Sequence, residues 1–145
     1  MVQSADLVVV GASAIDIISK PLPDDRPNLT PSTFPGTIRI SCGGVGRNIA
    51  ETSHRFFCGT SSGHRVLLLS PVGDDEFGNV LSRNCEKIGM RTDGLIFKTS
   101  RQSATCSVFL DSRGSLVGGI ADMDIVKMLL PEEVSYGHLC CLLKS

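Results

Sequence analysis

The sequence predicts an α/β protein that combines a parallel β-sheet with a separate, smaller antiparallel sheet. The first observation is a series of short apolar runs that alternate with stretches of helical periodicity up to about residue 97. This β-α-β-α-β order is typical of parallel strands joined by crossover helices. The second observation is a change, after residue 102, to alternation of apolar and polar residues, which is typical of an antiparallel hairpin.

The apolar runs define the parallel sheet and its connecting helices. We predict buried strands at residues 7–10, 66–69 and 95–97, because each is short and rich in Val, Leu or Ile. A helix follows the glycines after residue 42, and the residues on its expected buried face are Ile49, Ala50, Ser53, Phe56 and Phe57. A second helix ends at Gly89, and its expected buried stripe is Phe77, Val80, Leu81, Cys85 and Ile88.

The alternating segments define the second sheet. Residues 103–110 and 115–121 flank a turn at 111–114, which predicts a hairpin. Residues 37–41 alternate in the same way and predict a half-exposed strand. Because a hairpin does not fit inside a parallel core, we expect these strands to pair with each other as a separate small sheet.

The remaining segments carry weaker signals. Residues 21–36 contain five prolines and are predicted to be irregular or extended. A short helix is expected to start near Asp124 and to end before Pro131. Residues 138–145 are similar to the start of another strand.

Composition is that of an ordinary globular domain and argues against several functions. The chain has 145 residues, of which 41% are hydrophobic and 20% charged. A net charge of −1, one tyrosine and no tryptophan argue against binding to nucleic acid. No apolar run reaches the ~18 residues of a membrane span, and residues 1–6 contain no basic signal region. We therefore expect a cytoplasmic protein that binds neither nucleic acid nor membrane.

The cysteines and histidines do not predict a metal site. The six cysteines contain no Cys-x-x-Cys pair, and the three histidines have no ligand spacing relative to them. We expect no metal and interpret the cysteines as reduced thiols, several of them buried as small apolar groups.

Three glycines before the first helix form a candidate ligand-binding turn. Gly43, Gly44 and Gly46 permit positive φ and let a ligand approach the backbone. Free N–H groups at a helix start can bind hydroxyls or anions. The alternative is a tight strand-to-helix turn without a ligand, and the spacing alone does not decide between the two.

Two polar side chains are candidates for the same site. Asp16 follows the first strand, at the sheet edge where α/β proteins bind ligands, and its carboxylate suits a pair of vicinal hydroxyls. The alternative for Asp16 is an exposed loop acid, which is the commoner case. Asn48 lies at the start of the first helix, where its amide can bind sugar hydroxyls or cap the turn.

The other acidic pairs favour a structural interpretation. Asp74 and Asp75 are candidates for paired active-site carboxylates, but acids at a helix start also complement its dipole, and we favour that role. Asp122 and Asp124 have the same two interpretations. No Ser-His-Asp or Cys-His set stands out, so no catalytic residue is assigned.

Taken together, the motifs resemble those of the PfkB (ribokinase-like) carbohydrate kinase family. The run Gly43–Ala50 is similar to the first family signature, and Pro71–Gly78 matches the second half of that signature in order and distance. The resemblance covers residues 6–134. It implies a three-layer α/β/α sandwich, with its parallel sheet incomplete here, and an antiparallel lid made of strands near 37–41, 103–110 and 115–121. It also implies a sugar or nucleoside site whose residues are Asp16, Gly43, Gly44, Gly46 and Asn48.

Within the family, the chain is most similar to pseudouridine kinases. The segments Gly44–Glu51 and Ala121–Ile125 carry this likeness, whereas Ala14 stands where many relatives have asparagine. The resemblance implies a parent enzyme that uses ATP and Mg²⁺ to phosphorylate the 5′-hydroxyl of pseudouridine and that forms a homodimer through the lid. The alternatives are a ribokinase- or adenosine-kinase-type enzyme, a non-catalytic sugar-binding or dimerisation module, and a truncated product that folds poorly.

The family's catalytic motif is not in this sequence. Family members carry a Gly-Ala-Gly-Asp motif whose aspartate is the general base, and residues 1–145 contain no such motif. We therefore expect residues 1–145 to be the amino-terminal part of a kinase domain, with the ATP-binding part missing. The resemblance then implies that this chain keeps substrate recognition, binds neither ATP nor Mg²⁺ tightly, and is inactive alone.

Overall fold

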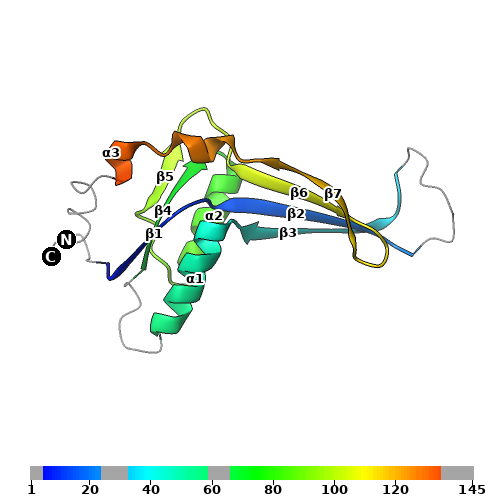
Figure 1. Cartoon of the computed structure of the whole chain (residues 1–145), viewed down its shortest axis with the longest axis horizontal. Helices are drawn as coiled ribbons and strands as arrows, with labels where there is room; N and C mark the ends of the chain where they lie inside the picture. The colour runs from blue at the N-terminus through cyan, green and yellow to red at the C-terminus, as the bar shows by residue number, and fades with distance from the viewer. Residues whose placement is uncertain (1–4, 24–32, 59–65, 135–145) are drawn as a thin grey trace.

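Two β-sheets and the helices beside them make up the fold, as the computed structural model of the chain shows (Figure 1). The structure describes residues 5–23, 33–58 and 66–134. One sheet has three strands in the order β1-β4-β5, and the other has four in the order β3-β2-β6-β7. The four-stranded sheet extends away from the body that contains the helices α1 and α2 (Figure 1).

The three-stranded sheet is parallel, as predicted. It consists of β1 (Leu7–Val10), β4 (Val66–Gly73) and β5 (Leu95–Lys98). The central strand β4 is longer than predicted because its first half pairs with β1 and its second half with β5. Pro71 fits within it because the Ser70 N–H points toward β5, to the Gly94 carbonyl. The ring nitrogen of Pro71 therefore faces the side where β1 has ended, and no ladder hydrogen bond is lost.

Helices α1 (Val45–Cys58) and α2 (Glu76–Lys87) pack against one face of this sheet. The strands alternate, so that Val66 and Leu68 of β4 join the core with the helices, whereas Leu67 and Leu69 form a second cluster on the opposite face. The α2 stripe is confirmed: Leu81 and Cys85 are buried, and the partly buried residues packed against the core include Phe77, Val80 and Ile88.

The predicted buried face of α1 is only partly right. Ala50 is buried, but Ile49 and Phe56 are 50% and 77% exposed. The buried stripe instead includes Arg47 and His54. Both polar side chains have tertiary partners, because Arg47 bonds to β3 and α2 as well as to Glu51 of its own helix, and His54 Nε2 lies 3.1 Å from the Ile88 carbonyl oxygen. Apolar periodicity does not detect a buried stripe of this kind.

The second sheet contains a strand that was not predicted. Its strands are β2 (Ala14–Pro21), β3 (Gly36–Gly43), β6 (Ala104–Leu110) and β7 (Leu116–Asp122). The β6–β7 hairpin is confirmed, but its pairing with residues 37–41 is wrong, since β2 lies between them. β2 is antiparallel to β3 and parallel to β6, so the sheet is mixed and not purely antiparallel.

Short connections complete the described part of the chain. The predicted hairpin turn is closed by Asp111, whose Oδ1 accepts hydrogen bonds from the N–H groups of Arg113 and Ser115, and by Gly114 at φ 93°. The helix expected near Asp124 is a 3₁₀ helix, η1 (Asp124–Met128), and α3 (Pro131–Val134) begins with its proline. The strand expected at residues 138–145 lies outside the described residues. None of the described helices has the length and apolar character to cross a membrane.

Candidate functional site

The carboxylate of Asp16 lies directly against the backbone of Gly43. In the β2–β3 register Ala14 pairs with Gly43 and Asp16 pairs with Ser41, so that the two site residues are diagonal neighbours. A Cβ atom added to Gly43 would lie 2.7 Å from Asp16 Cγ and closer still to Oδ2. Gly43 therefore provides the space that the carboxylate occupies. Asp16 follows the first strand as predicted, but it stands within strand β2 and not in a loop.

The other two glycines face the protein backbone. Gly44 has a φ of 92°, and a Cβ atom there would lie 2.8 Å from Ser13 Cα. A Cβ atom on Gly46 would lie 2.7 Å from the carbonyl carbon of Gly11. Both glycines thus let the start of α1 pack against the β1–β2 connection, which is the tight-turn interpretation.

Two N–H groups at the start of α1 are already used within the chain. The Arg47 N–H donates to the Ala12 carbonyl at 3.1 Å, and the Asn48 N–H donates to the Gly44 carbonyl at 2.9 Å. Neither group is free for an anion, which weakens the interpretation of this turn as a phosphate cradle.

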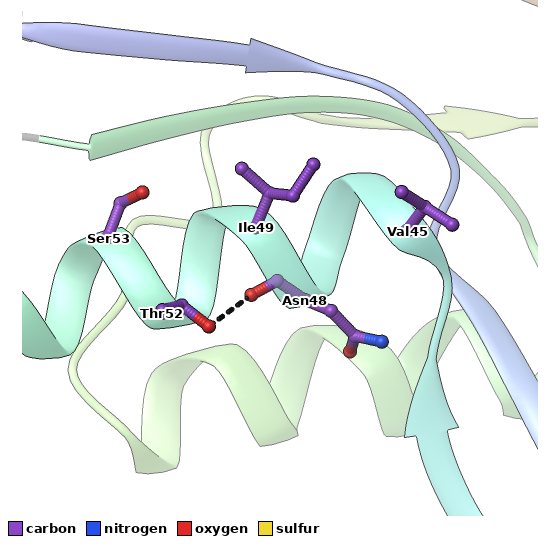
Figure 2. Close-up of a pocket in the computed structure, with 5 residues that line it drawn as sticks. All are labelled: Val45, Asn48, Ile49, Thr52 and Ser53. Atoms are coloured by element: carbon purple, nitrogen blue, oxygen red, sulfur yellow. Dashed lines mark hydrogen bonds between the residues drawn. The ribbon is translucent and has the colours of Figure 1, made fainter.

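Asn48 lies on the exposed side of α1, in an open groove lined by Val45, Asn48, Ile49, Thr52 and Ser53 (Figure 2). The Asn48 side chain points away from Ile49 and Ser53, and the Thr52 hydroxyl donates to the Asn48 carbonyl at 2.8 Å (Figure 2). The side-chain oxygen Oδ1 accepts a hydrogen bond from Arg47 Nη1 at 3.4 Å. One end of the amide is thus bound to the protein.

Arg47 is a residue at this site that the sequence reasoning missed. The residue is only 3% exposed, and its side chain joins β3, α1 and α2. Nη1 donates to the Cys42 carbonyl at 3.2 Å, and Nη2 donates to Glu51 Oε2 at 2.7 Å and to Asn84 Oδ1 at 2.5 Å. In the sequence, only its position between Gly46 and Asn48 points to a role at this site. Its bond to Asn84 could not be foreseen, because the two residues are 37 positions apart in the chain.

The charges around Arg47 stabilise its position. Glu51 is bound by Arg47 and by Arg55, at 2.7 Å from each. The hydrogen bond from Arg55, with the charge and hydrogen bond of Arg47, holds the pKa of Glu51 below its ordinary value despite some burial. Burial raises the pKa of the Cys42 and Cys85 thiols, against the opposing charge of Arg47. These two cysteines are therefore neutral thiols and not reactive thiolates.

Asp75 has the structural role that was favoured for it. Its Oδ1 accepts from the Gly78 N–H and from the Ser103 hydroxyl, and its Oδ2 accepts from the Ser103 N–H, each at 2.7 Å. Burial raises the pKa of Asp75, but the hydrogen bonds from Ser103 and Gly78 together hold it below its ordinary value. Asp75 is thus the N-cap of α2, and Asp74 beside it is exposed.

The later acidic pair also lies at a helix start. Asp122 Oδ1 accepts from the Asp124 N–H at 3.4 Å, and exposed Asp124 pairs with Lys127. Across residues 5–23, 33–58 and 66–134, no group of three or more His, Cys, Asp or Glu side chains is placed to hold a metal ion.

The chain is similar to known carbohydrate kinases over most of its length. The family described as pfkB family carbohydrate kinase matches residues 4–133. An uncharacterised sugar kinase of Escherichia coli (strain K12) is 32% identical over 125 residues, which are 86% of this chain and 32% of that protein. The pseudouridine kinase of the same organism is 29% identical over 126 residues, which are 87% of this chain and 37% of that protein.

A solved structure agrees with these matches. The crystal structure of a candidate sugar kinase from Clostridium perfringens superposes with a TM-score of 0.74 at 30% identity, and covers 91% of this chain and 39% of that one. The two sheets and their helices therefore form a ribokinase-like α/β fold. The chain spans about a third of the length of the curated relatives it matches.

Proposed function

The chain belongs to the pfkB family of carbohydrate kinases, and on that premise we propose that it recognises the ribosyl group of a nucleoside, with pseudouridine as the preferred ligand. The observation that carries the proposal is the Asp16 carboxylate against the backbone of Gly43. The 29% identity with a pseudouridine kinase supports the choice of nucleoside.

The residues at the site have complementary chemistry for a sugar. A carboxylate accepts hydrogen bonds from two vicinal hydroxyls, and an asparagine amide both donates and accepts. We therefore assign ligand contacts to Asp16, to the backbone of Gly43 and to Asn48. Gly44 and Gly46 act indirectly, because they let the start of α1 approach the β1–β2 connection.

We also propose that the whole enzyme transfers the γ-phosphate of ATP, with Mg²⁺, to the 5′-hydroxyl of its substrate in the cytoplasm. This chain alone would bind neither ATP nor Mg²⁺ tightly. The N–H groups of Arg47 and Asn48 are bonded within the chain, and the oxygens of Asp75 accept three hydrogen bonds. These groups are therefore not available to phosphates or to a cation.

The 145-residue chain should transfer no phosphate by itself. Asp16 would be occupied by sugar hydroxyls and Asp75 caps α2, so neither carboxylate is free to act as a general base. The test is a phosphotransfer assay with purified chain, saturating ATP, Mg²⁺ and pseudouridine, with Asp16→Ala as the control. Steady turnover that Asp16→Ala abolishes would show that this chain contains its own catalytic machinery.

A ligand panel tests the substrate class. We expect NMR titrations of the chain to give the tightest binding for pseudouridine, weaker binding for ribose and none for fructose. Tightest binding to free ribose would favour the ribokinase-type alternative. Equal binding of all three sugars would contradict recognition of a ribosyl group.

A second proposal is that the chain forms a homodimer through the four-stranded sheet. In the strand register Ile40 is opposite Ile17, and Ser19 lies between Ile38 and Phe109, so these side chains share one face of the sheet. Large exposed apolar residues on this face are Ile38, Ile40, Phe109 and Ile120, with exposed fractions of 46–71%. A contiguous exposed apolar surface favours a protein partner. Sedimentation should give a dimer for the wild type and a monomer for Ile40→Asp, and equal masses would contradict this proposal.

A further inference from the structure

We propose that Arg47 is a positioning residue that fixes the direction of the Asn48 amide, so that Asn48 presents its NH₂ group to the ligand. This inference rests on the proposed ribosyl-binding function and adds a specificity rule to it. Asn48 would then select a ligand atom that accepts a hydrogen bond.

The guanidinium of Arg47 cannot turn freely. Nη1 is bonded to the Cys42 carbonyl, and Nη2 is bonded to Glu51 and Asn84, so partners from β3, α1 and α2 hold both terminal nitrogens. The side chain is 4% exposed, so water cannot readily replace these partners. Because the guanidinium group is planar and both of its terminal nitrogens are bonded to fixed partners, the Arg47 side chain is held in one orientation.

That orientation determines which end of the Asn48 amide faces Arg47. A guanidinium carries only donors, so it can bond to Oδ1 of Asn48 but not to Nδ2. The observed contact is Nη1 to Oδ1 at 3.4 Å. If the Asn48 amide rotated by about 180°, its NH₂ group would face the N–H groups of Arg47 Nη1, and this hydrogen bond would be lost. Nδ2 is therefore the end that remains for a ligand.

The same nitrogen also connects Asn48 to the Asp16 side of the site. Nη1 donates both to Asn48 Oδ1 and to the carbonyl of Cys42, the residue before Gly43. Gly43 is the residue against which the Asp16 carboxylate lies. Arg47 is thus bonded both to Asn48 and to the residue before Gly43, so that it connects the two parts of the proposed site.

The resulting site has one accepting and one donating side chain. The Asp16 carboxylate accepts hydrogen bonds, and the NH₂ group of Asn48 donates them. Sugar hydroxyls can bind to either side chain, because the O–H group donates and its oxygen accepts. A ligand that offers only N–H donors toward Asn48, such as an amino sugar with an ammonium group, would bind poorly there.

The first experiment needs no ligand. In ¹⁵N-labelled chain, Arg47→Lys should shift the side-chain NH₂ resonances of Asn48, because one ammonium cannot reproduce both ends of the guanidinium fork. The matched control is Arg55→Lys, which changes an arginine on the same helix that bonds to Glu51 and not to Asn48. Unchanged Asn48 resonances in Arg47→Lys would overturn the inference. If Arg47→Lys does not fold, Asn84→Ala removes a partner of Arg47 and should shift the same resonances.

The second experiment is a double-mutant cycle on pseudouridine binding. Arg47→Lys should weaken binding roughly tenfold, the worth of about one hydrogen bond, in the wild-type background. The same change should have almost no effect in an Asn48→Ala background, because its action passes through Asn48. Equal losses in both backgrounds would show a general structural role and would overturn the inference. If the wild type binds no ribosyl ligand, the proposed function fails, whereas the orientation of Asn48 is still decided by the ligand-free spectra.

Discussion

Replacing Gly43 by alanine should weaken ligand binding strongly while leaving the fold stable. The added Cβ atom would lie 2.7 Å from Asp16 Cγ, so the carboxylate has to move away from the site. Gly43 does not have the positive φ of Gly44, and the atoms displaced are the flexible end of a side chain. A strained rotamer of the displaced Asp16 side chain would destabilise the fold by about 0.5–1.5 kcal/mol. The Gly→Ala change also lowers the conformational entropy of the unfolded chain, which stabilises the folded state by about 0.4–1 kcal/mol. The free energy of unfolding should therefore change by less than about 1 kcal/mol.

The neighbouring glycines provide matched controls with the opposite outcome. Gly44→Ala forces a left-handed alanine, which costs about 1–2 kcal/mol, and drives its Cβ atom into the backbone of Ala12 and Ser13. Gly46→Ala meets the backbone of Gly11, where overpacking costs about 1–3 kcal/mol. Both variants should be less stable than Gly43→Ala, although all three replace one glycine of the same motif.

The assay pairs urea denaturation with a pseudouridine titration for each variant. Loss of hydrogen bonds to a charged group, about 1.5–3 kcal/mol, predicts roughly 10- to 150-fold weaker binding for Gly43→Ala. Binding by Gly43→Ala as tight as that of the wild type would show that Gly43 does not provide the space for the Asp16 carboxylate. A loss of stability as large as that of Gly44→Ala would contradict the contact of the Gly43 Cβ position with a side chain alone.

Two further predictions concern Asp75. Asp75→Ala removes the acceptor of three hydrogen bonds and should lower the free energy of unfolding by about 2–3 kcal/mol in urea denaturation, whereas exposed Asp74→Ala should change it by less than about 0.5 kcal/mol. Because the folded state holds the pKa of Asp75 below its ordinary value of 3.8, protonation favours unfolding. The contribution of Asp75 should be complete above that value and fall as the pH drops through the folded pKa. A urea series from pH 6 to pH 2.5 should show a steeper loss for the wild type than for Asp75→Asn, and parallel curves would contradict the assignment.

Much of the fold could be predicted because its signals are local. The apolar runs of β1, β4 and β5 and the stripe of α2 identify these elements directly. β2 was missed because Ile15-Asp16-Ile17 is a short alternation before a proline-rich segment, and its partners lie far away in the sequence. Pairing of distant strands is not encoded in either strand alone.

The candidate site could also be predicted only in part, because some of its contacts depend on residues that are far apart in the sequence. Asp16 and Gly43 were expected together because both lie near the carboxyl edge of the parallel sheet. Their close contact, however, depends on the β2–β3 register, which the sequence does not reveal. Arg47 was not predicted because its partner Asn84 belongs to a different helix. The burial of a charged side chain such as Arg47 can be understood only from its hydrogen bonds to residues of other elements.

The most direct test of the account is calorimetric titration of the chain with pseudouridine, alongside Asp16→Asn. This substitution keeps the size of the side chain beside Gly43 but removes the charge and one of its acceptors. The account predicts saturable binding by the wild type and at least roughly tenfold weaker binding by Asp16→Asn, with unchanged thermal stability. Equal affinity for the two proteins, or no binding by a folded wild-type chain, would contradict the claim that this chain contains the substrate-recognition site.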